Sequence, residues 1–566
     1  MKLDTNLPDA NGFQQLIQDE WEARMRADPT FATYTGDHRF NHLLPSADED
    51  AFVRRLAELR HYQERFRALE PSDLDPADRL NASIFGRLLA DEITEIEFHY
   101  YRLPISKAYG FHTALPEQLP FVTPFDSIQD YDAYLSRLAT IPRYFAENMD
   151  LMRTGLQTGY LPPRVTLDEV GESIRKQCPA DPSQSLLYTP FQNFPTAITE
   201  VERSRLANKA RSLLLTTVFP AYQNLLRFFL DEYLPAARPG ISASELPDGV
   251  EFYRHRVRFY TSLDLTPEQV HQTGQDEVRR IRSEMTTVMK QVGFKGDFPA
   301  FLHFLRSEPR FYTTSPQELL QAVALILKRM DGELPRLFKT LPRTPYGIRE
   351  IPSASAPGST MAYYFPPSGD GRTAGFYYVN TYDLPSRPLY EMEALSLHEA
   401  VPGHHLQIAL QQELDLPNFR RFNGFTAFVE GWALYSERLG LETGFYQDPY
   451  SNFGRLSYEM WRACRLVVDT GMHALGWTRQ QAVDFMTENT SLTLLNITNE
   501  VDRYIAWPGQ ALAYKIGELK IRELRQKAED ALGARFNLRD FHDLVLTSGA
   551  VPLDVLETMV KEWIER

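Results

Sequence analysis

The sequence is poor in cysteine and in long hydrophobic runs. It contains two cysteines among 566 residues, Cys178 and Cys464, far apart in the chain, which excludes a disulfide-rich fold and a zinc site built on cysteine pairs. The most apolar helical stretch, residues 213–230, is interrupted by polar side chains such as Arg227, so we expect no membrane-spanning helix. The N-terminal segment also lacks the apolar core of a signal peptide, and we therefore expect a cytoplasmic protein.

Positive charge is in deficit. The chain has 60 basic and 75 acidic residues, a formal net charge of −15, which argues against binding to nucleic acids or to anionic membrane surfaces. Apolar residues make up 43% of the chain and charged residues 24%, a balance that supports a large folded core.

What the sequence does contain is mostly helical periodicity. Apolar side chains recur at steps of three and four, which predicts helices over long stretches that include 196–234, 267–291, 315–331, 455–475, 508–532 and 552–565. One region departs from this period: between about 344 and 382, three short β-rich runs are separated by Pro-Gly and Gly-Asp-Gly turns. We therefore predict a mainly α fold with one small sheet, placed directly before the most informative helix.

That helix carries a modified zinc-binding motif, which contains in order His398, Glu399, Pro402, His404 and His405. In zincins, two histidines four residues apart on one helix reach the same metal ion, and the glutamate between them acts as base. On an undistorted helix, His404 would point about 240° away from His398, and His405 would lie about 10 Å further along the axis. The Pro-Gly pair at 402 is expected to break the helix. We favour His398 and His404 as ligands, with His405 as the alternative to His404.

A third metal ligand is expected downstream. Glu430 lies among apolar residues in the stretch 425–437, so its carboxylate is expected to be buried and to need a cation or a hydrogen-bond partner. The segment between His404 and Glu430 is long enough for one helix, a turn at 416–418 and a returning helix. Two histidines and one glutamate with an open coordination position are typical of catalytic zinc.

Three motifs resemble signatures of the family called domain of unknown function 885: the histidine motif 398–405, the segment 429–437 and the segment 502–517. Upstream segments beginning at Gly249 and Thr266 extend the resemblance over essentially the whole chain. This family is grouped with the gluzincin metallopeptidases and is distantly similar to angiotensin-converting enzyme and neurolysin. The resemblance implies a large helical, two-lobed gluzincin-like fold with the small sheet beside the active-site helix. Within this single family-wide unit, we expect a helical N-terminal lobe, 1–245, and a catalytic lobe, 246–566.

The resemblance also implies roles for individual residues. Glu399 is the expected base, and Tyr504 or Tyr514 is the expected hydrogen-bond donor to the oxyanion. Arg503 and Lys515 are candidates for binding the free carboxylate of a short peptide.

The strand at Gly375–Asn380 has two interpretations. Either it presents an edge to which an extended peptide adds as a strand, with Asn380 as a substrate contact, or it belongs to a structural hairpin.

The leading function is a zinc metallopeptidase that cleaves short peptides, of carboxypeptidase or dipeptidyl-carboxypeptidase type, by attack of water activated by zinc and glutamate. One alternative is a zinc hydrolase of another small amide or ester, which the same site could perform. The other is a catalytically inactive protein that binds a metal or a peptide. A carboxylate-rich helical metalloprotein with redox iron is disfavoured, because the Glu-x-x-His pairs of the chain, Glu58–His61 and Glu268–His271, lie far from the segment 398–430 in the sequence.

Overall fold

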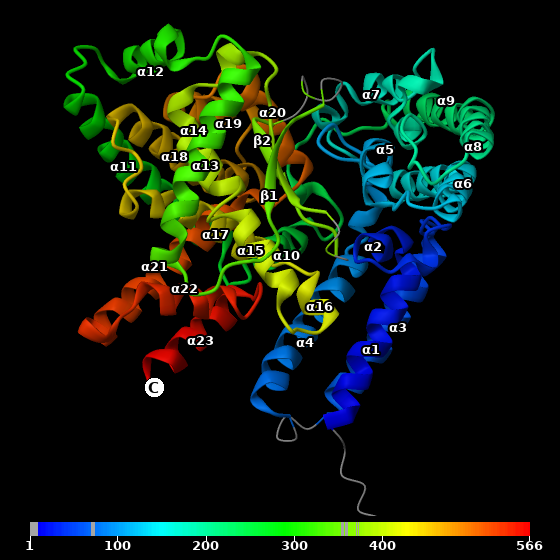
Figure 1. Cartoon of the computed structure of the whole chain (residues 1–566), viewed down its shortest axis with the longest axis horizontal. Helices are drawn as coiled ribbons and strands as arrows, with labels where there is room; N and C mark the ends of the chain where they lie inside the picture. The colour runs from blue at the N-terminus through cyan, green and yellow to red at the C-terminus, as the bar shows by residue number, and fades with distance from the viewer. Residues whose placement is uncertain (1–9, 70–73, 353–355, 357–359, 370, 372) are drawn as a thin grey trace, which may run out of the picture. The chain divides into compact units, whose positions relative to one another are not determined.

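The computed structural model describes residues 10–69, 74–352, 356, 360–369, 371 and 373–566. Over this part of the chain the protein is mainly helical, with one small three-stranded sheet, which confirms the predicted class (Figure 1). The chain divides into two compact units. The first comprises Met1–Ile241 and Glu245–Gly249, and the second comprises Ser242–Ser244 and Val250–Arg566. No helix within the described ranges is both long and apolar enough to cross a membrane.

The first unit is all helical in its described part. Its α-helices are α1 (Ala10–Ala27), α2 (Pro29–Tyr34), α3 (Glu49–Arg67), α4 (Pro76–Glu97), α5 (Phe111–Val122), α6 (Ile128–Thr158), α7 (Val170–Lys176), α8 (Glu200–Leu213) and α9 (Phe219–Phe228). Helix α6 begins with a capping box formed by Ser127 and Asp130, and its buried aromatic side chains, among them Tyr134 and Phe145, form much of the core. The apolar stretch 213–230, which runs through α9, packs one face into this core and leaves residues such as Leu215 and Leu230 exposed.

The second unit contains the remaining helices and the sheet. Its helices are α10 (Gly249–Thr261, of which Gly249 falls in the first unit), α11 (Pro267–Gln291), α12 (Phe298–Ser307), α13 (Pro316–Leu337), α14 (Leu389–Glu399), α15 (His404–Glu413), α16 (Asn418–Arg421), α17 (Thr426–Leu439), α18 (Pro449–Ala474), α19 (Arg479–Asn489), α20 (Leu494–Ala506), α21 (Ala513–Leu532), α22 (Leu538–Leu546) and α23 (Leu553–Ile564). Helices α14, α17, α18 and α21 pack against one another in its interior (Figure 1).

Two glycines bring α17 and α21 unusually close together. A side-chain carbon on Gly517 would lie 1.9 Å from the carbonyl oxygen of Ala427, and one on Gly431 would lie 2.5 Å from the Cα of Gly517. Neither position can therefore carry a larger residue while the two backbones stay in contact. Because Gly431 follows Glu430 directly, this contact fixes α21 beside the predicted third metal ligand.

The sheet consists of β1 (Tyr346–Glu350), β2 (Ala362–Phe365) and β3 (Gly375–Val379), in the order β1-β3-β2. The three predicted strands are thus confirmed. The interpretation of 375–380 as an edge is wrong, because β3 pairs in parallel with β1 on one side and antiparallel with β2 on the other. Asn380 is fully buried, and its side-chain amide donates to the carbonyl oxygens of Ala356 and Thr360. It closes a loop beside the sheet and does not face a substrate.

Candidate metal centre

The predicted break in the motif helix is a loop of four residues. Helix α14 ends at Glu399, and α15 begins at His404, with residues 400–403 looped out between them. A side-chain carbon on Gly403 would lie 1.9 Å from the carbonyl oxygen of His398, so the loop can fold this tightly only with glycine at that position. The loop absorbs the two residues by which this motif exceeds the zincin spacing, and it places the His404 ring back beside the His398 ring.

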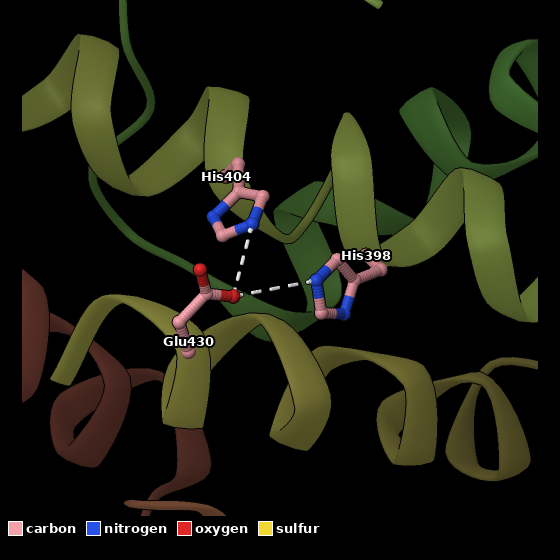
Figure 2. A group of neighbouring side chains, drawn as sticks. All are labelled: His398, His404 and Glu430. Carbon is pink, nitrogen blue, oxygen red and sulfur yellow. Dashed lines mark ion pairs between the residues drawn. The ribbon is translucent and has the colours of Figure 1, made fainter. Parts of the chain in front are cut away.

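Three side chains converge at this break (Figure 2). One carboxylate oxygen of Glu430, from α17, lies 3.7 Å from Nε2 of His398 and 3.5 Å from Nε2 of His404. The two imidazole rings are nearly perpendicular, with centroids 4.8 Å apart, and the three potential ligand atoms all lie within 4.8 Å of one another. The structure therefore assembles the two-histidine, one-glutamate set that the sequence motif suggests from three helices, α14, α15 and α17.

The chemistry of this set fits a divalent cation. The oxygen of Glu430 that faces both rings is buried, and it has no hydrogen-bond partner among the described residues. A buried carboxylate oxygen left in this way is costly unless a cation or a donor satisfies it. Two imidazole nitrogens and one carboxylate oxygen are the donors of catalytic zinc sites, in which ligand bonds are about 2.0–2.2 Å long. A zinc ion would be held by His398, His404 and Glu430.

Electrostatics tie the three groups together. Burial alone would lower the pKa of His398, but the carboxylates of Glu430 and Glu437 raise it to about 9. Burial alone would raise the pKa of Glu430, but the rings of His398 and His404 hold it well below its usual value. A cation bound here would displace the proton of His398, so metal binding is expected to weaken as the pH falls.

Glu437 contacts the His398 ring at Nδ1, the nitrogen that does not face Glu430. Its Oε1 lies 2.8 Å from Nδ1 of His398, and both side chains are almost completely buried. Arg462 pairs with the same carboxylate oxygen, with Nη2 at 3.6 Å from Oε1. A carboxylate that accepts from the outer nitrogen of a ligating histidine fixes its tautomer and leaves Nε2 free to bind the metal.

We predict that Glu437→Gln weakens zinc binding about 10- to 100-fold, because the substitution removes the charge that supports the ligating ring. The dissociation constant is to be measured by competition with a chromophoric chelator. Glu413→Gln is the matched control, since Glu413 lies on α15 but accepts from the backbone of Arg343 and Thr344. Equal zinc affinity in the Glu437 and Glu413 variants would contradict the orienting role.

His405, the alternative ligand, points to the sheet. Its Nδ1 lies 2.9 Å from the hydroxyl of Tyr364 on β2, and its ring packs against Tyr346 on β1. Burial lowers the pKa of His405 to about 4, so it is neutral at physiological pH. The group of potential ligand atoms found in the described residues includes His404 and not His405.

The three predicted catalytic residues, Glu399, Tyr504 and Tyr514, differ in their exposure and in their hydrogen-bond partners. Glu399 is the last residue of α14, next to His398 and partly exposed. Tyr514, on α21, lies within electrostatic reach of Glu430, whose charge together with burial raises the pKa of the phenol. The Tyr504 hydroxyl, by contrast, donates to Glu500 at 2.7 Å and accepts from the side chains of two residues of α18. The Tyr504 hydroxyl is therefore fully engaged within the protein, whereas Tyr514 is partly exposed.

The two predicted carboxylate-binding residues also differ. Lys515 is completely buried in ion pairs with Glu277, Glu459 and Glu518, which leaves it no access to a substrate. Arg503 pairs with Glu500 and donates from Nη1 to the side-chain oxygen of Gln510 at 2.9 Å, and its side chain is about one-fifth exposed.

Sequence reasoning missed Glu437 and Arg465. Glu437 could have been found from the sequence, because it stands seven residues after Glu430 and so shares its helix face. It also lies in the segment 429–437 that resembles the family. Arg465 carried none, since nothing in the local pattern distinguishes it from other arginines on helix faces.

The fold and site thus define a helical protein with a two-histidine, one-glutamate centre at a broken helix. Residues 29–560 match the family described as "Bacterial protein of unknown function (DUF885)". The chain belongs to this family, which confirms the first part of the resemblance noted in the sequence. Among curated proteins, none matches the chain.

Two solved structures resemble this one. A putative lipoprotein from Colwellia psychrerythraea is 28% identical, with a TM-score of 0.92 and coverage of 99% of this chain and 100% of that one. A putative lipoprotein of unknown function from Shewanella oneidensis is 19% identical, with a TM-score of 0.74 and coverage of 96% and 99%. The expected cytoplasmic location is wrong, because both neighbours are described as lipoproteins, a class of exported, membrane-anchored protein.

Proposed function

We propose that the protein is a zinc-dependent hydrolase, and specifically a metallopeptidase that cleaves short peptides. The observation that carries the proposal is the convergence of His398, His404 and Glu430, with the buried oxygen of Glu430 directed at both rings. The position of Glu399, adjoining a ligand and partly exposed, supports its role as the general base. We also propose that the helices around this centre form a gluzincin-like fold.

The mechanism divides the work among the chain's own residues. Zinc, when bound, supplies Lewis acidity that polarises the scissile carbonyl and makes water a stronger acid. Glu399 accepts the proton of the attacking water and passes it to the leaving amine. Glu437 holds the His398 ring in place through Nδ1. We assign to the Tyr514 hydroxyl the donation of a hydrogen bond to the oxygen on which negative charge develops, because a phenol is protonated at neutral pH.

The proposal is tested by hydrolysis of a library of short peptides with free termini, with the products identified by mass spectrometry. We expect cleavage that is lost after treatment with 1,10-phenanthroline and restored by adding zinc back, because the centre supplies all the chemistry of the reaction. Cleavage that survives complete chelation would overturn the zinc mechanism. A zinc-loaded protein that cleaves no member of the library would overturn the peptidase assignment.

A further inference from the structure

A second group of charged side chains lies in the same unit as the metal centre. Glu500 and Arg503, on α20, and Arg465, on α18, form what we call the arginine cluster. The Glu500 carboxylate accepts from Nη2 of Arg465 at 3.1 Å and from Nη2 of Arg503 at 2.9 Å. Burial alone would raise the pKa of Glu500, but the two guanidinium groups lower it to about 2, so it is ionised at neutral pH. Two cations and one anion leave the cluster with a net charge of +1.

The cluster has an unused hydrogen-bond donor. The Arg465 side chain is 4% exposed, and its Nη1 is buried without a hydrogen-bond partner among the described residues. Its other two nitrogens are engaged, Nε with the Tyr504 hydroxyl at 2.9 Å and Nη2 with Glu500. A buried guanidinium with an unsatisfied donor is costly, and an anionic ligand would satisfy both the charge and the donor.

Tyr514 connects the cluster with the metal centre. The Arg465 guanidinium lies over the Tyr514 ring at 4.5 Å and over the Trp461 ring at 4.3 Å. Tyr514 lies about one helical turn before Gly517, whose backbone touches that of Gly431, the residue after Glu430. Tyr514 and Trp461 are both partly exposed, and so is Arg503. The arginine cluster therefore packs against α21, the helix whose backbone touches that of the Glu430 helix α17.

We propose that the arginine cluster binds the carboxylate at the carboxyl end of a peptide, so that the protein acts on peptides with a free C-terminus. The inference rests on the proposed hydrolase function and deepens it by naming the substrate class. Arg465 and Arg503 are the binding pair, in place of the predicted pair Arg503 and Lys515, because three carboxylates already surround Lys515. Arg465 supplies the open donor, Nη1, and Arg503, whose nitrogens already donate to Glu500 and Gln510, supplies positive charge at the partly exposed border.

The test measures binding without turnover. Purified protein with Glu399→Gln, loaded with zinc, is titrated calorimetrically with an N-acetylated dipeptide as the free acid and as the C-terminal amide. We expect the acid to bind at least about tenfold more tightly, the range for hydrogen bonds to a charged group. A third ligand, an amide that carries a glutamate side chain, distinguishes a terminal from a side-chain carboxylate. Binding of this third ligand as tightly as the free acid would overturn the assignment to the terminus.

Variants locate the effect. Arg503→Gln, at the partly exposed member, is expected to bring the acid-to-amide ratio of affinities close to one, and Arg465→Lys to reduce it at least threefold while retaining the charge. Arg525→Gln is the control, because Arg525 is a half-buried arginine paired with Glu442 and lies about 16 Å along α21 from Tyr514. Thermal unfolding of each variant verifies that it is folded.

Two results separate this inference from the proposed function. Equal binding of acid and amide by a protein that hydrolyses peptides would overturn the cluster's role and leave the hydrolase intact. Selective binding of the acid by a protein that cleaves nothing would support the cluster and overturn the hydrolase. A ratio unchanged in both Arg503→Gln and Arg465→Lys, with both variants folded, would also overturn the inference.

Discussion

Glu399→Gln is expected to retain its metal and to lose peptide hydrolysis by a factor of about 10² to 10⁴, the usual contribution of a general base. Glutamine keeps the size and shape of the side chain but cannot accept the proton of the attacking water. Glu399 is the last residue of α14 and is not in the ligand group, so the ion should be unaffected. The measurement pairs steady-state hydrolysis with metal analysis of the same preparation.

The matched control for this variant is Glu393→Gln. Glu393 lies on the same helix, but its carboxylate accepts from the backbone N–H of Tyr446 and the hydroxyl of Ser451. We expect this variant to hydrolyse peptides at close to the wild-type rate. Full activity in Glu399→Gln would remove the proposed base, and loss of the metal from that variant would show that Glu399 acts as a ligand instead.

The second large effect distinguishes the two adjacent histidines. His404→Ala is expected to lose zinc and activity together, because its Nε2 faces the same Glu430 oxygen as His398. His405→Ala is expected to keep zinc and to unfold at a lower temperature, because it removes a buried ring that is hydrogen-bonded to Tyr364 and packed against Tyr346. Metal analysis and thermal unfolding of both variants are the measurements. Retention of zinc by His404→Ala with loss from His405→Ala would reverse the assignment.

The sequence predicted the helices and strands around the site better than the loop at 400–403 that joins two of the helices. The period of apolar residues indicates helices and strands because each element must bury one face, and the strands between 344 and 382 were found in this way. The loop at 400–403 was expected only as some form of break. Its conformation depends on a close approach between Gly403 and the carbonyl oxygen of His398, which no spacing rule contains.

Long-range pairing explains the errors. Lys515 looked available for a substrate because its three carboxylate partners come from distant positions, 277 and 459, as well as from the next helical turn. Asn380 and the strand before it looked like an edge because the partner strand β1 is remote in sequence and cannot be paired from local pattern. The cellular location was wrong for a different reason. The expectation used only the local pattern near residue 1, whereas the correction comes from similarity to a putative lipoprotein over 99% of this chain.

We propose above all that His398, His404 and Glu430 bind one zinc ion. Inductively coupled plasma mass spectrometry of the purified wild type and of Glu430→Ala tests it most directly, with Glu442→Ala as a control on a carboxylate that pairs with Arg525. We expect about one zinc per chain in the wild type and the control, and almost none in Glu430→Ala, because catalytic zinc requires three protein ligands. A wild type that holds no zinc after incubation with excess metal, or a Glu430→Ala variant that holds as much as the wild type, would contradict the account.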